Sequence, residues 1–160
     1  MADTKILTPE MTAAITALLP RYPSRQAVTL PALHLVNDTL RYVPRQAVVE
    51  IAQLLGLAPA QVQDTLTFYG YFKQDEPHGR CRLWVCRSIS CALRGADELL
   101  EHLSQALHVA PGETTTDGRV TLEYAECLGA CEHAPCMLAD QQLVTTVTKE
   151  SAAEFARALP

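Results

Sequence analysis

The chain has 160 residues, of which 48% are hydrophobic and 19% are charged, and its formal net charge is −5. This composition excludes a disordered or fibrous chain, and the length suffices for one ordinary domain or two small ones. The excess of acidic residues argues against binding to a phosphate backbone, which needs a concentrated basic surface. No apolar run approaches the roughly 18 residues that span a bilayer, and residues 1–5 show no export or transit pattern. We therefore expect a soluble intracellular protein.

The six cysteines are the feature that composition leaves unexplained. They are too few for a small disulfide scaffold, and a reducing compartment would keep them as thiols. Cysteines that cluster in such a chain are more often metal ligands or catalytic groups than disulfide partners. Their positions along the chain therefore bear most directly on function.

The first part of the chain, residues 1–75, has the apolar period of helices. Four helices are expected, with a kink at Pro31 in the second and with Tyr69 facing inward in the fourth. Their apolar faces would form the core of a small helical domain. The residues expected to open or close these helices are Thr8, Pro9, Pro20, Pro23, Ser24, Pro44, Gly56 and Pro59.

The apolar period changes after a polar, turn-rich segment at residues 74–79. In residues 76–160 the order of elements reads β-α-β-β-β-α, which favours a mixed sheet with helices packed against it. The predicted fold class is therefore α/β (α+β), an N-terminal helical bundle followed by a smaller α/β domain. The expected strands are 80–85, 120–124, 136–139 and 143–147, and the expected helices are 95–109 and a short last one that contains Phe155.

Four cysteines lie in the two loops that follow the first two predicted strands. Four residues separate Cys86 from Cys91, and three separate Cys127 from Cys131. Two such loops at one edge of a sheet can present four thiolates, which are soft ligands that suit zinc or an iron–sulfur cluster. The wide first gap favours a two-iron cluster, because structural zinc sites more often have two-residue gaps. Gly129 is expected to offer its backbone N–H to the sulfurs.

Two further cysteines are interpreted as structural thiols, in the core or near the cluster. Cys81 lies on the apolar face of the first predicted strand, and Cys136 begins the hairpin directly after Pro135. Buried thiols behave as small hydrophobic side chains in such positions. A role as a fifth ligand or as a redox group is the alternative for both.

The second cysteine pair lies in a recognisable sequence. Ala125–Cys131, followed by Ala134 and Pro135, resembles the second half-motif of the thioredoxin-like [2Fe–2S] subunit of NADH–quinone oxidoreductase. The first pair, Cys86-x4-Cys91, is similar to the first half-motif, and the 35 residues between the halves match the family's spacing. The resemblance covers nearly the whole chain. Further segments that carry it are Tyr22–Pro23, Leu33–Val36, Thr67–Tyr69 and Gly112–Gly118.

The sequence departs from the family's pattern at two positions. Asn37 stands where the family often has Gln, and Cys136 stands where an apolar residue is usual. Neither position belongs to the four cysteines of the half-motifs. Both leave open which branch of the family the chain represents.

The resemblance implies one [2Fe–2S] cluster bound by Cys86, Cys91, Cys127 and Cys131, with no catalytic residue in the chain. It implies an electron-transfer subunit of an NADH dehydrogenase, respiratory complex I, that is not an enzyme alone. FMN and NADH would bind to a partner subunit, beside a further iron–sulfur subunit, and the N-terminal helices would hold that partner. The chain would be cytoplasmic and would reach the inner face of the bacterial plasma membrane only through the complex.

Several alternatives remain open. NAD-reducing hydrogenases and NAD-dependent formate dehydrogenases have closely similar diaphorase subunits, and a four-cysteine zinc module acting in assembly is an alternative of another class. Residues 47–66 resemble a helix-turn-helix, but the would-be recognition helix 59–66 has no Lys or Arg. Nucleic acid is therefore not an expected partner. A Rieske-like site at His133 lacks a second histidine in the loops, and no Cys-x-x-Cys is present for dithiol exchange.

Overall fold

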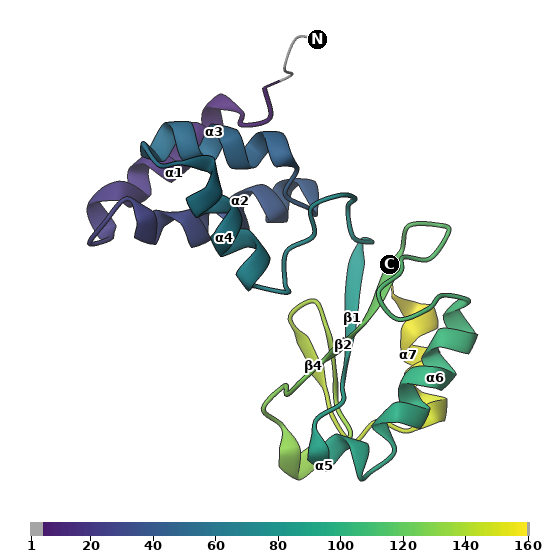
Figure 1. Ribbon diagram of the computed structural model, residues 1–160. Helices are drawn as coiled ribbons and strands as arrows, with labels where there is room; N and C mark the ends of the chain where they lie inside the picture. Colours follow the sequence, from purple (N-terminus) through teal and green to yellow (C-terminus); the bar gives the residue numbers. More distant parts are fainter. Residues whose placement is uncertain (1–4, 160) are drawn as a thin grey trace. The chain divides into compact units, whose positions relative to one another are not determined.

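The computed structural model describes residues 5–159, so Met1–Thr4, part of the segment inspected for an export pattern, lie outside the described residues. The chain divides between Pro77 and His78 into two compact units, which are described separately (Figure 1). Among the described residues, no helix is both long enough and apolar enough to cross a bilayer.

The first unit is helical. Its elements are α1 (Pro9–Leu18), η1 (Leu19–Arg21), η2 (Gln26–Val28), α2 (Thr29–Leu40), α3 (Arg45–Leu55) and α4 (Pro59–Phe68), where η marks a 3₁₀ helix. The predicted caps of α1 and α3 are confirmed. The hydroxyl of Thr8 accepts a hydrogen bond from the N–H of Met11 at 3.2 Å, and Gly56 ends α3 with φ of +66°. That left-handed conformation favours glycine, which has no Cβ.

Two details of the helical prediction are wrong. The second helix begins at Thr29, because Ser24 accepts a hydrogen bond from the N–H of Ala27 and starts the separate turn η2. Pro31 consequently lies in the first turn of α2, where its missing N–H breaks no helical hydrogen bond, and it marks a helix start instead of a kink. Tyr69 follows α4 with its side chain 41% exposed.

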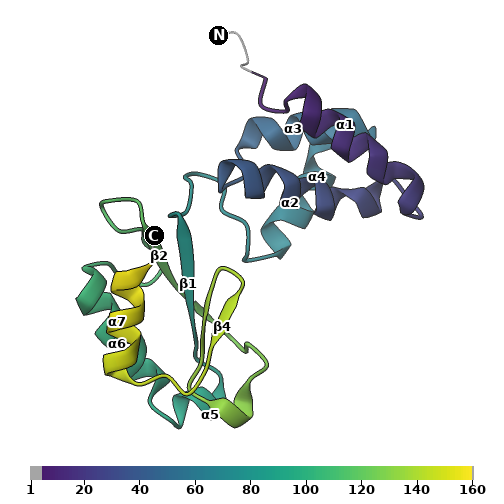
Figure 2. The same cartoon turned by 180° about the vertical axis from the view of Figure 1, so that it is seen from behind.

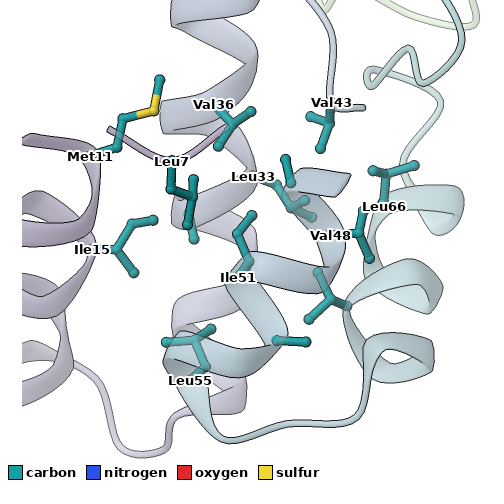
Figure 3. Close-up of a cluster of buried hydrophobic side chains, with 14 of the residues drawn as sticks. Leu7, Met11, Ile15, Leu33, Val36, Val43, Val48, Ile51, Leu55 and Leu66 are labelled. Atoms are coloured by element: carbon teal, nitrogen blue, oxygen red, sulfur yellow. The ribbon is translucent and has the colours of Figure 1, made fainter. Parts of the chain in front are cut away.

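The core of the helical unit forms where the apolar faces of the four α-helices meet (Figure 3). Full burial of one such Leu or Ile side chain contributes about 1.5–3 kcal/mol. Asn37, one of the two departures from the family pattern, is also buried, and its Oδ1 has no hydrogen-bond partner among the described residues. Core side chains labelled in Figure 3 include Leu7, Met11, Ile15, Leu33, Val36, Val43, Val48, Ile51, Leu55 and Leu66.

The second unit contains the predicted mixed sheet. The four strands lie in the order β2-β1-β3-β4, with β1 parallel to β2 and antiparallel to β3, which is in turn antiparallel to β4. The strands are β1 (Cys81–Cys86), β2 (Val120–Ala125), β3 (Met137–Ala139) and β4 (Gln142–Val144). The helices are α5 (Ile89–Ala92), α6 (Ala96–Leu107), η3 (Cys131–His133) and α7 (Lys149–Ala158).

Helices α6 and α7 lie side by side against one face of the sheet, as the two opposite views show (Figures 1 and 2). Alternate residues of β1, Leu83 and Val85 among them, face these helices, which confirms the predicted alternation. On the opposite face Arg82 is also buried, because its guanidinium pairs with Glu123 of β2 at 2.7 Å. This sheet fixes the edge from which the cysteine loops leave.

Candidate metal centre

Three cysteine sulfurs lie together in the interior of the second unit. Cys86 ends β1, Cys91 lies in α5, and Cys136 directly precedes β3. Their Sγ atoms all lie within 4.8 Å of one another, and each residue is only 1% exposed. The Sγ atoms of Cys91 and Cys136 are 3.8 Å apart. We refer to these three residues as the buried thiol group.

Two more sulfurs form an exposed pair. The Sγ atoms of Cys127 and Cys131 lie 4.0 Å apart in the loop after β2. Gly129 adopts φ of +80° between them, and its N–H donates a hydrogen bond to the Cys127 sulfur at 3.4 Å. This is the predicted donation. Two thiolates that bind one tetrahedral metal at about 2.3 Å lie about 3.8 Å apart, so the spacing of this pair suits a single metal ion.

The two loops contact one another and bring the buried thiol group and the exposed pair to the same end of the sheet. Helix α5 packs against η3. The N–H of Arg87 donates a hydrogen bond to the carbonyl of Ala125 at 2.9 Å, and the thiol of Cys86 donates one to the carbonyl of Glu126 at 3.7 Å. Ala130 packs with the buried thiol group in one small apolar cluster. Five of the six cysteines are therefore gathered here, whereas Cys81 lies at the other end of β1.

The pKa values of the three buried thiols are shifted in different directions by their surroundings. Burial opposes ionisation of Cys86, but the N–H groups of Ser88 and Leu128 outweigh it, and the pKa of this thiol is lowered. Burial raises the pKa of Cys91, and it raises the pKa of Cys136 to about 12. The surroundings of Cys86 thus favour its thiolate form more than those of Cys91 and Cys136 do. A bound cation would favour the thiolate form of the others as well.

The donor set was tested for its fit to an iron–sulfur cluster. Within residues 5–159, the buried thiol group is the one set of three or more potential ligands whose ligand atoms lie within 4.8 Å of one another, and it contains neither histidine nor carboxylate. His133 is exposed on η3 and does not join it. Soft thiolates with backbone N–H donors directed at them fit a [2Fe–2S] cluster, and this geometry does not favour a Rieske-like site.

Charges beside the site partly cancel. Glu126, directly before Cys127, forms an ion pair with Arg87 at 2.6 Å, and Arg87 also lies 3.9 Å from the centre of the Tyr124 ring. The sequence suggests that Glu126 and Glu132 would oppose added negative charge at the site. The Arg87 pair offsets the charge of Glu126, so Glu132 is the acid that retains this effect.

Sequence reasoning did not specify which residues Cys136 would contact. Cys136 was expected to be a core or near-cluster structural thiol, and it lies beside the ligand cysteines, with its Sγ 3.8 Å from that of Cys91. The signal is the antiparallel pairing of Val85 with Met137, which places Cys136 opposite Cys86. No local spacing in the sequence indicates that pairing.

An all-thiol site on a mixed sheet with two helices on one face fits the class of iron–sulfur proteins with thioredoxin-like architecture. The sequence profile described as "Thioredoxin-like [2Fe-2S] ferredoxin" matches residues 15–159. The chain belongs to this family of thioredoxin-like [2Fe–2S] ferredoxins.

Characterised relatives extend over most of the chain. It is 42% identical over 127 residues to a subunit of NADH–quinone oxidoreductase from Rhizobium meliloti, a match that covers 79% of this chain and 75% of the relative. It is 37% identical over 132 residues to "NADH-quinone oxidoreductase subunit 2" of Thermus thermophilus, covering 81% and 72% of the two chains. These relatives are subunits of an oxidoreductase complex.

A solved structure shares the fold. An NAD⁺-reducing [NiFe]-hydrogenase in the H₂-reduced state superposes with a TM-score of 0.64 at 20% sequence identity. The match covers 97% of this chain but 23% of the hydrogenase chain, so this chain corresponds to about a quarter of that longer polypeptide.

Proposed function

We propose that this chain holds one [2Fe–2S] cluster through Cys86 and Cys91 of the first loop and Cys127 and Cys131 of the second. The observation that carries the proposal is the convergence of the two cysteine loops at one edge of the sheet. At the second loop the backbone N–H of Gly129 donates a hydrogen bond to the Cys127 sulfur at 3.4 Å. Such donors stabilise negative charge on ligand sulfurs.

The chain acts as an electron-transfer subunit of an NADH–quinone oxidoreductase. When bound, a [2Fe–2S] cluster accepts and returns a single electron. The protein holds the ligands in two different environments, since Cys86 and Cys91 are shielded from water and Cys127 and Cys131 are exposed. The exposed pair therefore gives the site one side open to a partner, and the buried pair closes the other side.

The partner side is also apolar. Ile89 and Leu93, one turn apart around α5, are 75% and 82% exposed next to Cys91. Exposed apolar side chains beside a functional site are typical of a protein interface. We infer that a flavin- and NADH-binding subunit docks here and supplies the electron, with a further iron–sulfur subunit in the same complex. The chain itself would then perform no catalysis.

As a subunit of such a complex, the chain would work in the cytoplasm and would be attached to the inner face of the bacterial plasma membrane only through the complex. The fold shared with the hydrogenase supports a second assignment, the corresponding diaphorase subunit of an NAD-reducing hydrogenase. In both assignments the cluster, its ligands and the direction of the open side are the same.

Metal analysis tests the proposal. Iron, acid-labile sulfide and zinc are measured on anaerobically purified protein, with EPR spectra before and after dithionite. Two irons and two sulfides per chain, with a rhombic signal only after reduction, are expected. One zinc with no sulfide, persisting after anaerobic reconstitution with iron and sulfide, would instead establish a zinc assembly module.

A further inference from the structure

We infer that Cys136 is a reserve ligand of the metal centre, a thiol that replaces Cys86 when the Cys86 sulfur is lost. The inference rests on the proposed function, because it presumes that the wild-type chain binds a cluster. It concerns the member of the buried thiol group that the proposed function does not use.

The first argument is the spacing of the sulfurs. Cys91 Sγ lies 3.8 Å from Cys136 Sγ, which is the separation of about 3.8 Å expected for two thiolates on one tetrahedral metal. The exposed pair has nearly the same separation, 4.0 Å. Cys91 with Cys136, like Cys127 with Cys131, therefore has the spacing of two ligands of one metal.

The second argument is the position of Cys136 relative to Cys86. The N–H of Cys86 donates a hydrogen bond to the carbonyl of Cys136 at 3.1 Å, directly beyond the antiparallel pair Val85 and Met137. Cross-strand neighbours project from the same face of a sheet, with Cβ atoms about 4.5–5.5 Å apart. The Cys136 thiol can therefore reach the region of the Cys86 sulfur without a change in the backbone.

The third argument is that the neighbours of Cys136 are sulfurs. Cys81 packs among the core residues Leu83 and Val120, and among the described residues it belongs to no group of sulfurs. Cys136 instead lies within 4.8 Å of the sulfurs of both Cys86 and Cys91. It has the position of a ligand, although only four of the five thiols gathered here are needed.

The chemistry of the replacement is simple. The Cys136 thiol loses its proton to solvent, and the resulting thiolate forms the iron–sulfur bond that Cys86 formed before. No electron is transferred, and the total of four thiolate ligands is restored. The sulfur is supplied from the residue directly before β3 instead of from the end of β1, so the bond angle at the exchanged position differs and the reduced cluster should show a changed EPR signal.

The test compares iron and sulfide contents and EPR spectra of Cys86→Ala, Cys86→Ala/Cys136→Ala and Cys86→Ala/Cys81→Ala, each after anaerobic reconstitution. We expect the single variant and the Cys81 double variant to retain two irons and two sulfides with the same shifted signal. The Cys136 double variant should lose the cluster. Cys81 is the matched control, because it is a second buried thiol, at the opposite end of the same strand.

Equal cluster content in Cys86→Ala and Cys86→Ala/Cys136→Ala, whether both retain it or both lose it, would overturn the inference. Far-UV circular dichroism of the metal-free variants establishes folding. If an alanine variant is unfolded, Cys86→Ser and Cys136→Val replace it, and an all-thiolate spectrum in Cys86→Ser alone becomes the expected result. A wild-type chain without a cluster would contradict the proposed function, whereas a loaded wild type with no difference between the variants would contradict only the reserve ligand.

Discussion

Cys86 and Ala125 are paired in register at the C-terminal ends of the parallel strands β1 and β2. Parallel strands end at the same edge of a sheet, so the loops that follow them leave from neighbouring points. Each loop carries two cysteines, and their convergence follows from this register. The antiparallel strand β3 then adds Cys136 from the other side of β1. The site is therefore a consequence of the mixed sheet.

The rate of alkylation should distinguish exposed cysteine thiols from buried ones. In the folded, metal-free chain we expect iodoacetamide at neutral pH to label Cys127 and Cys131 first, because these two are exposed. Burial and the pKa of about 12 at both Cys81 and Cys136 make those thiols slow to react. Mass spectrometry of digested protein measures the labelling of each site.

The cluster-loaded chain and the unfolded chain provide the controls for this experiment. Cluster binding should protect Cys127 and Cys131, and denaturant should expose all six cysteines to labelling. Labelling of Cys136 as fast as Cys127 in the folded metal-free chain would contradict the described burial.

Much of the site was predictable from the sequence, because its ligands are local features. A cysteine at the end of an alternating strand and another a few residues later indicate a loop site, and Gly129 between the second pair indicates a close backbone N–H. For Cys136 the sequence left open a position in the core or near the cluster, because its proximity to Cys86 depends on antiparallel pairing between segments 50 residues apart.

In the fold, too, local features were predictable from the sequence and features without a local signal were not. Helices with a clear apolar period and a capping residue were predicted well, as Thr8 and Gly56 illustrate. The short elements α5 and η3 have four and three residues, fewer than are needed to show a helical period. The position of Pro31 was misjudged because η2 interrupts what reads as one continuous apolar pattern.

The stability of the helical unit should fall at acid pH through Glu50. Its carboxylate accepts hydrogen bonds from the N–H of Leu7 at 2.7 Å and from that of Ile6 at 2.9 Å. Burial opposes the charge, but these donors outweigh it and lower the pKa of Glu50. A lowered pKa in the folded state gives stability that is complete above the unfolded value of about 4.3 and is lost as pH falls through the folded pKa.

Glu50→Gln should remove this contribution, because an amide cannot accept both hydrogen bonds equally well. We expect a loss of about 1.5–3 kcal/mol near neutral pH, the range for hydrogen bonds to a charged group, and a smaller loss below pH of about 4. Urea unfolding of the metal-free chain followed by far-UV circular dichroism measures it. Glu154→Gln, an exposed carboxylate on α7, is the control, and an equal effect of the two variants at all pH values would contradict the assignment.

The buried ion pair between Arg82 and Glu123 should contribute more to the free energy of unfolding than the exposed ion pair between Lys149 and Glu98. Arg82 Nε and Nη2 lie 2.7 and 3.0 Å from the two carboxylate oxygens of Glu123, and both side chains are largely buried. Glu123→Ala leaves a buried guanidinium without this partner, which destabilises by about 3–5 kcal/mol.

The single tryptophan, Trp84, reports on this experiment, because its indole N–H donates to Glu123 in the same group. Urea unfolding followed by tryptophan fluorescence should show a clearly lower midpoint for Glu123→Ala. Glu98→Ala removes the exposed pair with Lys149 and should leave the midpoint almost unchanged, since water screens that pair. Similar midpoints for the two variants would show that burial of Arg82 does not depend on its partner.

Replacement of the exposed ligand Cys127 should impair cluster binding without affecting the folding of the chain. Cys127 is outside the apolar cores, and its sulfur accepts a hydrogen bond from Gly129 at 3.4 Å. We expect Cys127→Ser to keep the far-UV circular dichroism and the melting temperature of the metal-free chain, because no core contact changes. The reduced-state EPR signal should be lost or reshaped, since an oxygen ligand is harder than a thiolate and binds the cluster less well.

Cys81→Ala is the complementary variant, which should change the melting temperature and leave the EPR signal unchanged. It removes a buried thiol packed against Leu83 and Val120, so it should lower the melting temperature while leaving the iron content and the EPR signal at wild-type values. The two variants together therefore separate a ligand from a core side chain on independent measurements. An unchanged EPR spectrum in Cys127→Ser, with two irons per chain, would remove Cys127 from the ligand set and point to the buried thiol group as the larger part of the site.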